Sequence, residues 1–175
     1  MILARLILGL LSLSPMTGYE MKKHFDSSIN HFWNADKAQI YRTLAQLVAD
    51  GYATVETIRQ DNYPDRQEHH LTDAGRAALN DWLRGPVSAP SIREPFIARI
   101  FFAGEMERDE VMDLVGRRRV ASTVLLADYL SQREEIDGQA IADRRNFLMA
   151  ATLDHGIKHA YAELEWLDAV EKDLP

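Results

Sequence analysis

The segment at residues 85–95, GPVSAPSIREP, places the strongest constraint on how this chain can fold. It holds three of the six prolines of the 175-residue sequence, together with a glycine and two serines. Proline lacks a backbone donor and restricts the residue before it, so such a segment interrupts helices and strands alike. The sequence therefore predicts two domains, residues 1–84 and 96–175, joined by a linker at 85–95.

Three short helical patterns open the first of these domains. The first covers about residues 2–13 and has leucines at helical spacing before a Ser-Pro pair ends it. The second and third begin with capping-box sequences, Thr17-x-x-Glu20 and Asp36-x-x-Gln39. In a capping box the two side chains satisfy free backbone N–H groups of the first helical turn. These starts predict helices from Thr17 and from Asp36.

Two strand-like runs follow the third helix. They cover residues 52–60 and 66–71, and the turn residues DNYPD lie between them. A fourth helix is predicted from Thr72 to near Gly85. This order indicates a mainly α fold: a winged helix-turn-helix with a three-helix core and a two-stranded wing, followed by a C-terminal helical domain. In a helix-turn-helix the second helix of the pair enters the DNA major groove.

The third helix is the candidate recognition helix. Its predicted buried stripe is Tyr41, Leu44, Leu47 and Val48. Its predicted outward face has polar side chains at i, i+3, i+4 and i+7, namely Gln39, Arg42, Thr43 and Gln46. Arginine can pair with guanine and glutamine with adenine through two hydrogen bonds, so this face is suited to reading bases. The alternative is a polar face that is only solvated.

Long helical patterns fill the second domain. A short apolar helix is expected at about 95–103, and longer ones at about 107–136 and 138–172. Amphipathic helices with few partners in their own chain must bury their apolar stripes elsewhere, and most soluble oligomers are symmetric dimers. We therefore expect a homodimer. A self-contained helical hairpin in a monomer is the alternative.

The charge is acidic overall but unevenly distributed. The formal net charge is −7, yet residues 1–84 hold 9 Lys and Arg against 10 Asp and Glu, whereas residues 85–175 hold 11 against 17. The excess of acid thus lies outside the candidate DNA-binding domain, although a basic balance is usual for such domains. The apolar first helix resembles a signal peptide only weakly and no stretch could span a bilayer, so the protein is expected in the cytoplasm.

Motifs for enzyme chemistry are missing from the sequence. There is no cysteine, and no nucleophile elbow or phosphate-binding glycine loop occurs. The pair His155 and His159 shares a helical face, but the glutamate of a metalloprotease motif is absent. The sequence therefore predicts neither an enzyme nor a metal or other cofactor.

The chain resembles the PadR-like transcriptional regulators. The resemblance is carried by LILGLLSLSPMTGYEMKKHF at 6–25, FWNADKAQIYRTLAQLVADGY at 32–52 and HHLTDAGRAALNDWL at 69–83. REPFIARIFFAGEM at 93–106 and AYAELEWL at 160–167 resemble the subgroup with phenolic-acid-responsive repressors and a virulence activator. The family often has Ser-Pro-Gly-Ser where this chain has residues 36–39, and two tyrosines in place of its two adjacent wing histidines.

This resemblance implies roles for individual residues. Gln39 and Arg42 would lie in the major groove, whereas Lys37 and the Tyr41 hydroxyl would contact phosphates. The wing arginines, Arg59 and Arg66, would reach the DNA backbone or the minor groove. Alternatively, these two arginines belong to a solvated hairpin in which they pair with Glu56 or Glu68.

The resulting hypothesis is a dimeric regulator, more a repressor than an activator, that binds a near-palindromic operator. A small aromatic effector would bind between the domains, near Trp33, Phe96 and Trp166, although core packing also explains these side chains. The alternative function is a winged-helix module that binds proteins and has lost DNA binding.

Overall fold

The computed structural model describes residues 2–59, 65–87, 93–137 and 143–175. The chain divides into two compact units, Met1–Ala89 and Pro90–Pro175. Most of the turn predicted between the strands, at 61–65, lies outside the described residues.

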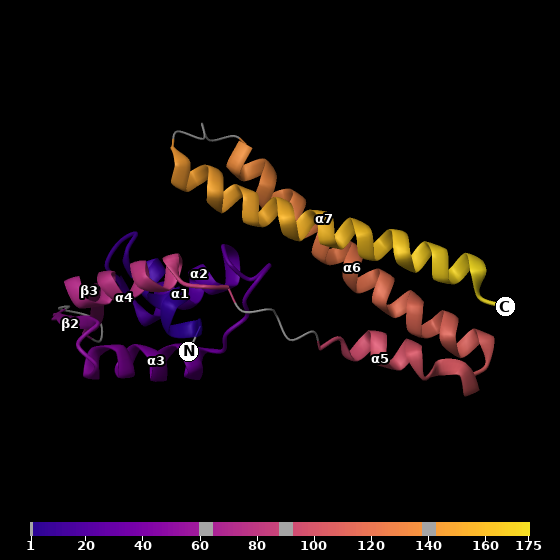
Figure 1. Ribbon diagram of the computed structural model, residues 1–175, viewed down its shortest axis with the longest axis horizontal. Helices are drawn as coiled ribbons and strands as arrows, with labels where there is room; N and C mark the ends of the chain where they lie inside the picture. The colour runs from indigo at the N-terminus through magenta and orange to yellow at the C-terminus, as the bar shows by residue number, and fades with distance from the viewer. Residues whose placement is uncertain (1, 60–64, 88–92, 138–142) are drawn as a thin grey trace. The chain divides into compact units, whose positions relative to one another are not determined.

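The first unit is a three-helix core with a small antiparallel sheet and a fourth helix (Figure 1). Its elements are α1 (Ile2–Leu11), β1 (Met16–Thr17), α2 (Gly18–Ser27), α3 (Lys37–Ala49), β2 (Ala53–Ile58), β3 (Arg66–Leu71) and α4 (Asp73–Arg84). The strand order is β1-β3-β2. The predicted winged helix-turn-helix is therefore confirmed, with one addition: β1 was not predicted, and it extends the wing to three strands.

Both predicted capping boxes are present and fix where α2 and α3 begin. The side chain of Thr17 accepts a hydrogen bond from the backbone N–H of Glu20, and Asp36 does the same for Gln39. In each helix the third residue returns a side-chain bond to the backbone of the cap. Gly51, beyond the end of α3, has a φ of 76°, which glycine adopts without strain.

The core of this unit forms where α1 packs against both α3 and α4 (Figure 1). Six of its side chains are at most 1 % exposed: Ile7, Leu8, Met21, Phe25, Ile40 and Leu44. They come from α1, α2 and α3, so burial of apolar surface fixes the three helices to one another. The outer side of α3 is therefore held in a defined orientation.

A glycine allows α4 to approach the start of the wing. A Cβ atom at Gly75 would lie 2.1 Å from the carbonyl oxygen of Tyr52. The cap of α4, Thr72, accepts from the N–H of Gly75 and donates its hydroxyl to the carbonyl of Gly51, at 3.1 and 2.8 Å. The Thr-x-x-Gly sequence thus joins α4 to the end of α3 and the beginning of β2.

The second unit is helical. It contains α5 (Pro95–Phe101), a short 3-10 helix η1 (Ala103–Glu105), α6 (Arg108–Asp137) and α7 (Arg144–Asp173). The long helices α6 and α7 pack side by side (Figure 1). Charged pairs connect them along their length: Arg118 to Glu163 at 2.6 Å, Arg119 to Glu171 at 2.9 Å and Arg133 to Asp154 at 2.8 Å.

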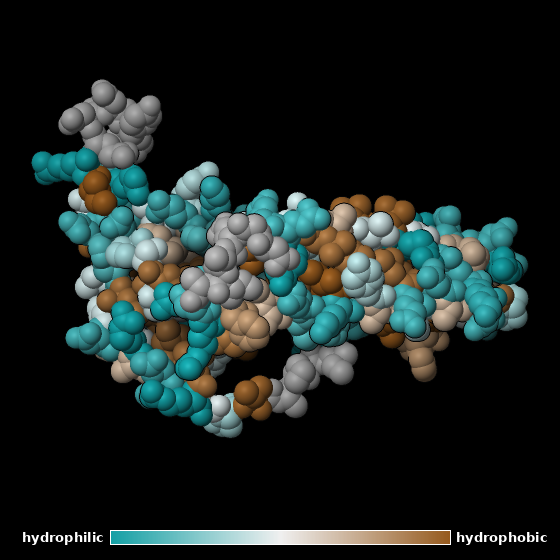
Figure 2. All heavy atoms as spheres, turned by 90° about the horizontal axis from the view of Figure 1, so that it is seen from above, coloured by the Kyte–Doolittle hydropathy of each residue, from teal (hydrophilic) through white to brown (hydrophobic). Residues whose placement is uncertain are grey.

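Apolar side chains also lie on the outside of this helical unit. Figure 2 shows brown, hydrophobic atoms gathered on part of its surface. Those on α6 and α7 that are at least 44 % exposed are Val120, Val124, Leu125, Phe147, Leu148, Met149 and Tyr161. Among the residues searched, which are those the structure describes, no helix combines the length and apolarity needed to cross a membrane.

Candidate nucleic-acid interface

Helix α3 buries a different stripe from the one predicted. The buried residues are Ile40, Thr43, Leu44 and Leu47, whereas Tyr41 is 43 % exposed. Thr43 is only 4 % exposed, and its hydroxyl donates to the carbonyl of Gln39 at 2.8 Å. This bond along the helix satisfies the hydroxyl and lets it face the interior. The structure thus buries Thr43 and exposes Tyr41, the reverse of what was predicted for these two side chains. Thr43 still lines one groove beside α3 together with Arg42, so its part in DNA binding stays a prediction.

Two of the remaining predicted base readers already have hydrogen bonds. The side-chain oxygen of Gln39 accepts from the N–H of Asp36 at 3.3 Å, and Gln46 donates to Asp50 at 2.7 Å. Arg42 is exposed, and within the described part of the chain it has no hydrogen bond or ion pair. Its guanidinium can therefore bind an external acceptor without first breaking a contact that the structure records.

Two open grooves flank α3, so that the helix forms a ridge between them. One groove, called the wing groove here, lies against α2 and the sheet, and its lining includes Tyr19, Lys23, Tyr41, Val55 and Arg66. The other includes Ile2, Trp33, Asn34, Gln39, Arg42 and Gln46. A protruding helix of this kind suits the major groove of B-DNA, which is about 12 Å wide and 8.5 Å deep.

Tyr19 and Lys23 were not predicted as site residues. They lie at i and i+4 on α2, and both are exposed. Their spacing gave a usable signal, because the first helix of a helix-turn-helix crosses the DNA backbone. The wing groove brings them to Tyr41 and Arg66, which come from other elements.

Gly18 permits the close approach of Tyr41 to the start of α2. A Cβ atom at Gly18 would lie 2.8 Å from Cζ of Tyr41 and 3.1 Å from its hydroxyl oxygen. The ammonium group of Lys37 lies 5.6 Å from the centre of the Tyr41 ring, within the range of a cation–π contact. Lys37 and the Tyr41 hydroxyl therefore occupy one end of the exposed side of α3.

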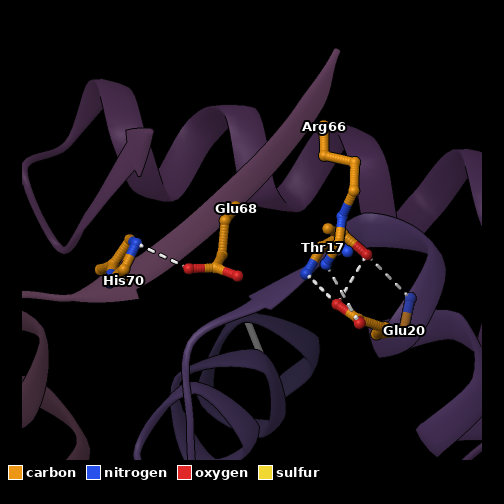
Figure 3. A network of polar contacts seen from close by, with 5 residues as sticks. All are labelled: Thr17, Glu20, Arg66, Glu68 and His70. Atoms are coloured by element: carbon orange, nitrogen blue, oxygen red, sulfur yellow. Dashed lines mark hydrogen bonds and ion pairs between the residues drawn. The ribbon is translucent and has the colours of Figure 1, made fainter. Parts of the chain in front are cut away.

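At the wing, Arg66 pairs with neither of the glutamates considered from the sequence. Its Nη2 lies 3.4 Å from Oε1 of Glu20 on α2 (Figure 3). Oε2 of Glu20 accepts from the backbone N–H and the hydroxyl of Thr17, each at 2.8 Å. Bonds from Thr17, with a smaller contribution from Arg66, hold the pKa of Glu20 below its ordinary value. Arg59 is exposed beside the undescribed wing tip.

The two adjacent histidines of the wing have opposite environments. Nε2 of His70 lies 3.2 Å from Glu68 and 3.6 Å from Glu56 (Figure 3). His69, on the other face of β3, is buried, and burial lowers its pKa from the ordinary 6.5. A smaller, opposing effect comes from its hydrogen bond to the backbone of Met16. Burial therefore disfavours the protonated form of His69.

The buried His69 predicts a loss of stability in acid. Below pH 6.5 the unfolded chain binds a proton that the folded chain resists, so the free energy of unfolding falls as pH falls. One histidine can change the free energy of unfolding by at most about 1.4 kcal/mol per pH unit. Urea unfolding at pH values from about 7 to about 5, on either side of the ordinary histidine pKa of about 6.5, measures this loss. The free energy of unfolding should depend less steeply on pH in His69→Phe than in the wild type. Replacement of the exposed His24 by Gln should retain most of the wild-type pH dependence. If the free energy of unfolding depended equally on pH in the wild type and in His69→Phe, the buried His69 would not be its source.

The three predicted effector residues take part in packing within their own units. Phe96 and Trp166 meet edge to face with ring centres 6.1 Å apart, and Arg118 lies 5.2 Å above the Phe96 ring. Trp33 packs against the core of the first unit. Their part in effector binding stays a prediction.

Among the described residues, no group of three or more His, Asp or Glu side chains could hold a metal ion. His155 and His159 lie next to each other on α7, with ring centres 4.5 Å apart. Two imidazoles alone do not make the closed ligand set of a structural metal site.

A three-helix core whose exposed third helix lies beside an antiparallel wing defines a winged helix-turn-helix protein, the class named above from the sequence. Residues 7–81 match the transcriptional regulator PadR-like family, and residues 92–174 match the C-terminal domain described as virulence activator alpha C-term. The chain therefore contains a PadR-like family domain and is a PadR-type winged-helix regulator.

Individual relatives agree with this assignment. The negative transcriptional regulator PadR of Bacillus subtilis is 29 % identical over 135 residues, which cover 77 % of this chain and 74 % of the relative. The crystal structure of B. subtilis PadR in complex with operator DNA has a TM-score of 0.88 at 25 % identity, covering 98 % of each chain. The Vibrio cholerae virulence activator AphA has a TM-score of 0.73 at 29 % identity, covering 98 % of this chain and 97 % of AphA.

Proposed function

We propose that this regulator binds a near-palindromic operator as a homodimer and represses transcription. The observation that carries the proposal is the exposed, unpaired Arg42 on a helix that protrudes between two grooves. Arg42, with Gln39 and Gln46 beside it, would read bases. Lys37, Tyr41, Arg59 and Arg66 would hold phosphates, which set the position of a protein on DNA but do not specify sequence.

The domain roles follow from this proposal. Residues 1–84 would bind DNA, 85–95 would link the domains and 96–175 would form the dimer. The exposed apolar side chains of α6 and α7 support this role, because a second copy can bury them. A dimer would place its two recognition helices about 34 Å apart, one turn of DNA.

Repression and effector control are the finer parts of the proposal. Repression is supported by the relative named as a negative regulator. Phe96 and Trp166 would offer an aromatic surface to a small aromatic effector. Such an effector would act by binding two states of the protein unequally, one of which binds the operator more weakly.

A salt titration tests DNA binding against the alternative of a protein-interaction module. The affinity for duplex DNA should fall steeply with salt, with a log–log slope of about −0.9 for each neutralised phosphate. Fluorescence anisotropy with a labelled duplex from the region flanking its own gene provides the measurement. A slope near zero, or no binding at low salt, would favour the protein-interaction module. The relatives act as transcriptional regulators rather than enzymes.

A further inference from the structure

The ion pair between Glu20 and Arg66 connects α2 to the wing. Glu20 is the third residue of α2, and Arg66 is the first residue of β3. Their contact, at 3.4 Å, joins residues 46 positions apart in the sequence (Figure 3). Both side chains are accessible, at 45 % and 42 % exposure, so an external ligand can reach either of them.

The two partners are held with different firmness. One carboxylate oxygen of Glu20 accepts two hydrogen bonds from Thr17, so this side chain is anchored to the cap of α2. Arg66 makes a single contact through one nitrogen, longer than the 2.7–2.9 Å typical of charged hydrogen bonds. Within the described residues, Arg66 has no other acceptor. Arg66 is therefore the partner that can move.

The surroundings of this pair suit a phosphate group. Arg66 and Glu20 both line the wing groove, together with the hydroxyl-bearing Tyr19 and Tyr41 and the ammonium group of Lys23. Arginine, lysine and tyrosine side chains are common ligands of DNA phosphates. Two carboxylates, Glu20 and Asp65, also line the groove and would repel a phosphate; of these, Glu20 is the one recorded in contact with Arg66.

We propose that Glu20 is an intramolecular competitor of DNA: it holds Arg66 in the free protein and yields it to a backbone phosphate in the complex. This inference rests on the proposed DNA-binding function. Exposed ion pairs contribute little to stability, so the exchange is easily reversed. Arginine can bind a phosphate through two parallel hydrogen bonds, which Glu20 does not offer in its present geometry.

The exchange of Arg66 from Glu20 to a phosphate should change how the affinity for DNA depends on salt. When Arg66 leaves Glu20 for a phosphate, the DNA releases a cation, but the uncovered carboxylate attracts one in return. Removal of the carboxylate charge abolishes this second step. The log–log slope of affinity against salt should then become steeper by up to about 0.9.

Glu20→Gln is the test variant, because glutamine also fits the third position of a capping box and should keep α2 folded. Anisotropy with one fixed duplex of mixed sequence is sufficient, since phosphate contacts are independent of sequence. We expect about a two- to fivefold higher affinity at low salt, the range of an exposed ion pair, and a steeper slope. Thermal unfolding of the variant checks that the cap survives.

Two controls separate this competition from general repulsion. Glu56→Gln removes an exposed wing carboxylate that lies in no recorded contact with Arg66, and it should leave the slope nearly unchanged. In an Arg66→Ala background, Glu20→Gln should lose most of its effect, because only the general repulsion between carboxylate and phosphate is left to remove. The proposal is overturned if Glu20→Gln raises the affinity by the same factor with and without Arg66. It is also overturned if Glu20→Gln leaves the salt slope unchanged or weakens binding. Failure of the wild-type protein to bind the duplex would instead overturn the proposed function.

Discussion

Replacement of Arg42 by alanine is expected to weaken operator binding by about 1–3 kcal/mol, which is roughly 5- to 150-fold, and to relax the preference at one base pair. The reason is geometric: Arg42 is exposed on α3 and has no described partner, whereas Gln39 and Gln46 already have hydrogen bonds. Its loss would therefore remove the two proposed hydrogen bonds to a guanine and no recorded internal contact.

Lys37→Ala and Arg76→Ala provide the comparison for this result. Lys37 is expected to contact a phosphate. Its replacement by alanine should therefore weaken binding to all DNA sequences alike and reduce the magnitude of the salt slope by about 1. Arg76 is exposed on α4, which packs on α1, and its replacement should change neither affinity nor preference. Binding to the operator and to single-base variants of it measures both quantities. Unchanged affinity and preference in Arg42→Ala would show that another residue reads the operator.

Local sequence signals predicted the ends of the helices, but not which side of α3 is buried. The capping boxes at Thr17 and Asp36 were confirmed because their hydrogen bonds span only three residues. On α3, by contrast, apolar residues at 40, 41, 44, 47 and 48 cover a wide arc, and either edge of it could face the core. Packing against the other helices determines which edge is buried. Ile40 lies in the core, and Tyr41 is exposed and lies against Gly18.

Contacts between distant residues account for the rest of what the sequence did not predict. Strand β1 is only two residues long, and it exists because Met16 and Thr17 pair with β3. Likewise, the cross-strand glutamates were the natural candidates for Arg66, but its partner lies on α2. A single sequence contains no local pattern for either contact, because both depend on how α2 and the wing come together.

Gly75→Ala is expected to destabilise the first unit by about 3 kcal/mol, the upper end of the usual range for overpacking. A Cβ atom here would lie 2.1 Å from the carbonyl oxygen of Tyr52 and 2.8 Å from the side chain of Leu71. The nearest obstacle is backbone, and that carbonyl also accepts from the N–H of Thr72. The junction of α4 with the wing must therefore move as a whole.

Replacement of Gly9 by alanine should instead increase the stability of the first unit. Gly9 lies within α1, and a Cβ atom there would meet nothing within 4 Å. Alanine is favoured over glycine inside a helix, so Gly9→Ala should stabilise the unit by about 0.5–1 kcal/mol. Urea midpoints at constant m-value compare the two variants.

If Gly75→Ala were neutral, α4 would not approach Tyr52 as closely as described, and the Thr-x-x-Gly sequence would need another explanation. If instead Gly75→Ala weakened DNA binding while the protein stayed folded, movement of this junction would reach the wing, because the carbonyl of Tyr52 directly precedes β2.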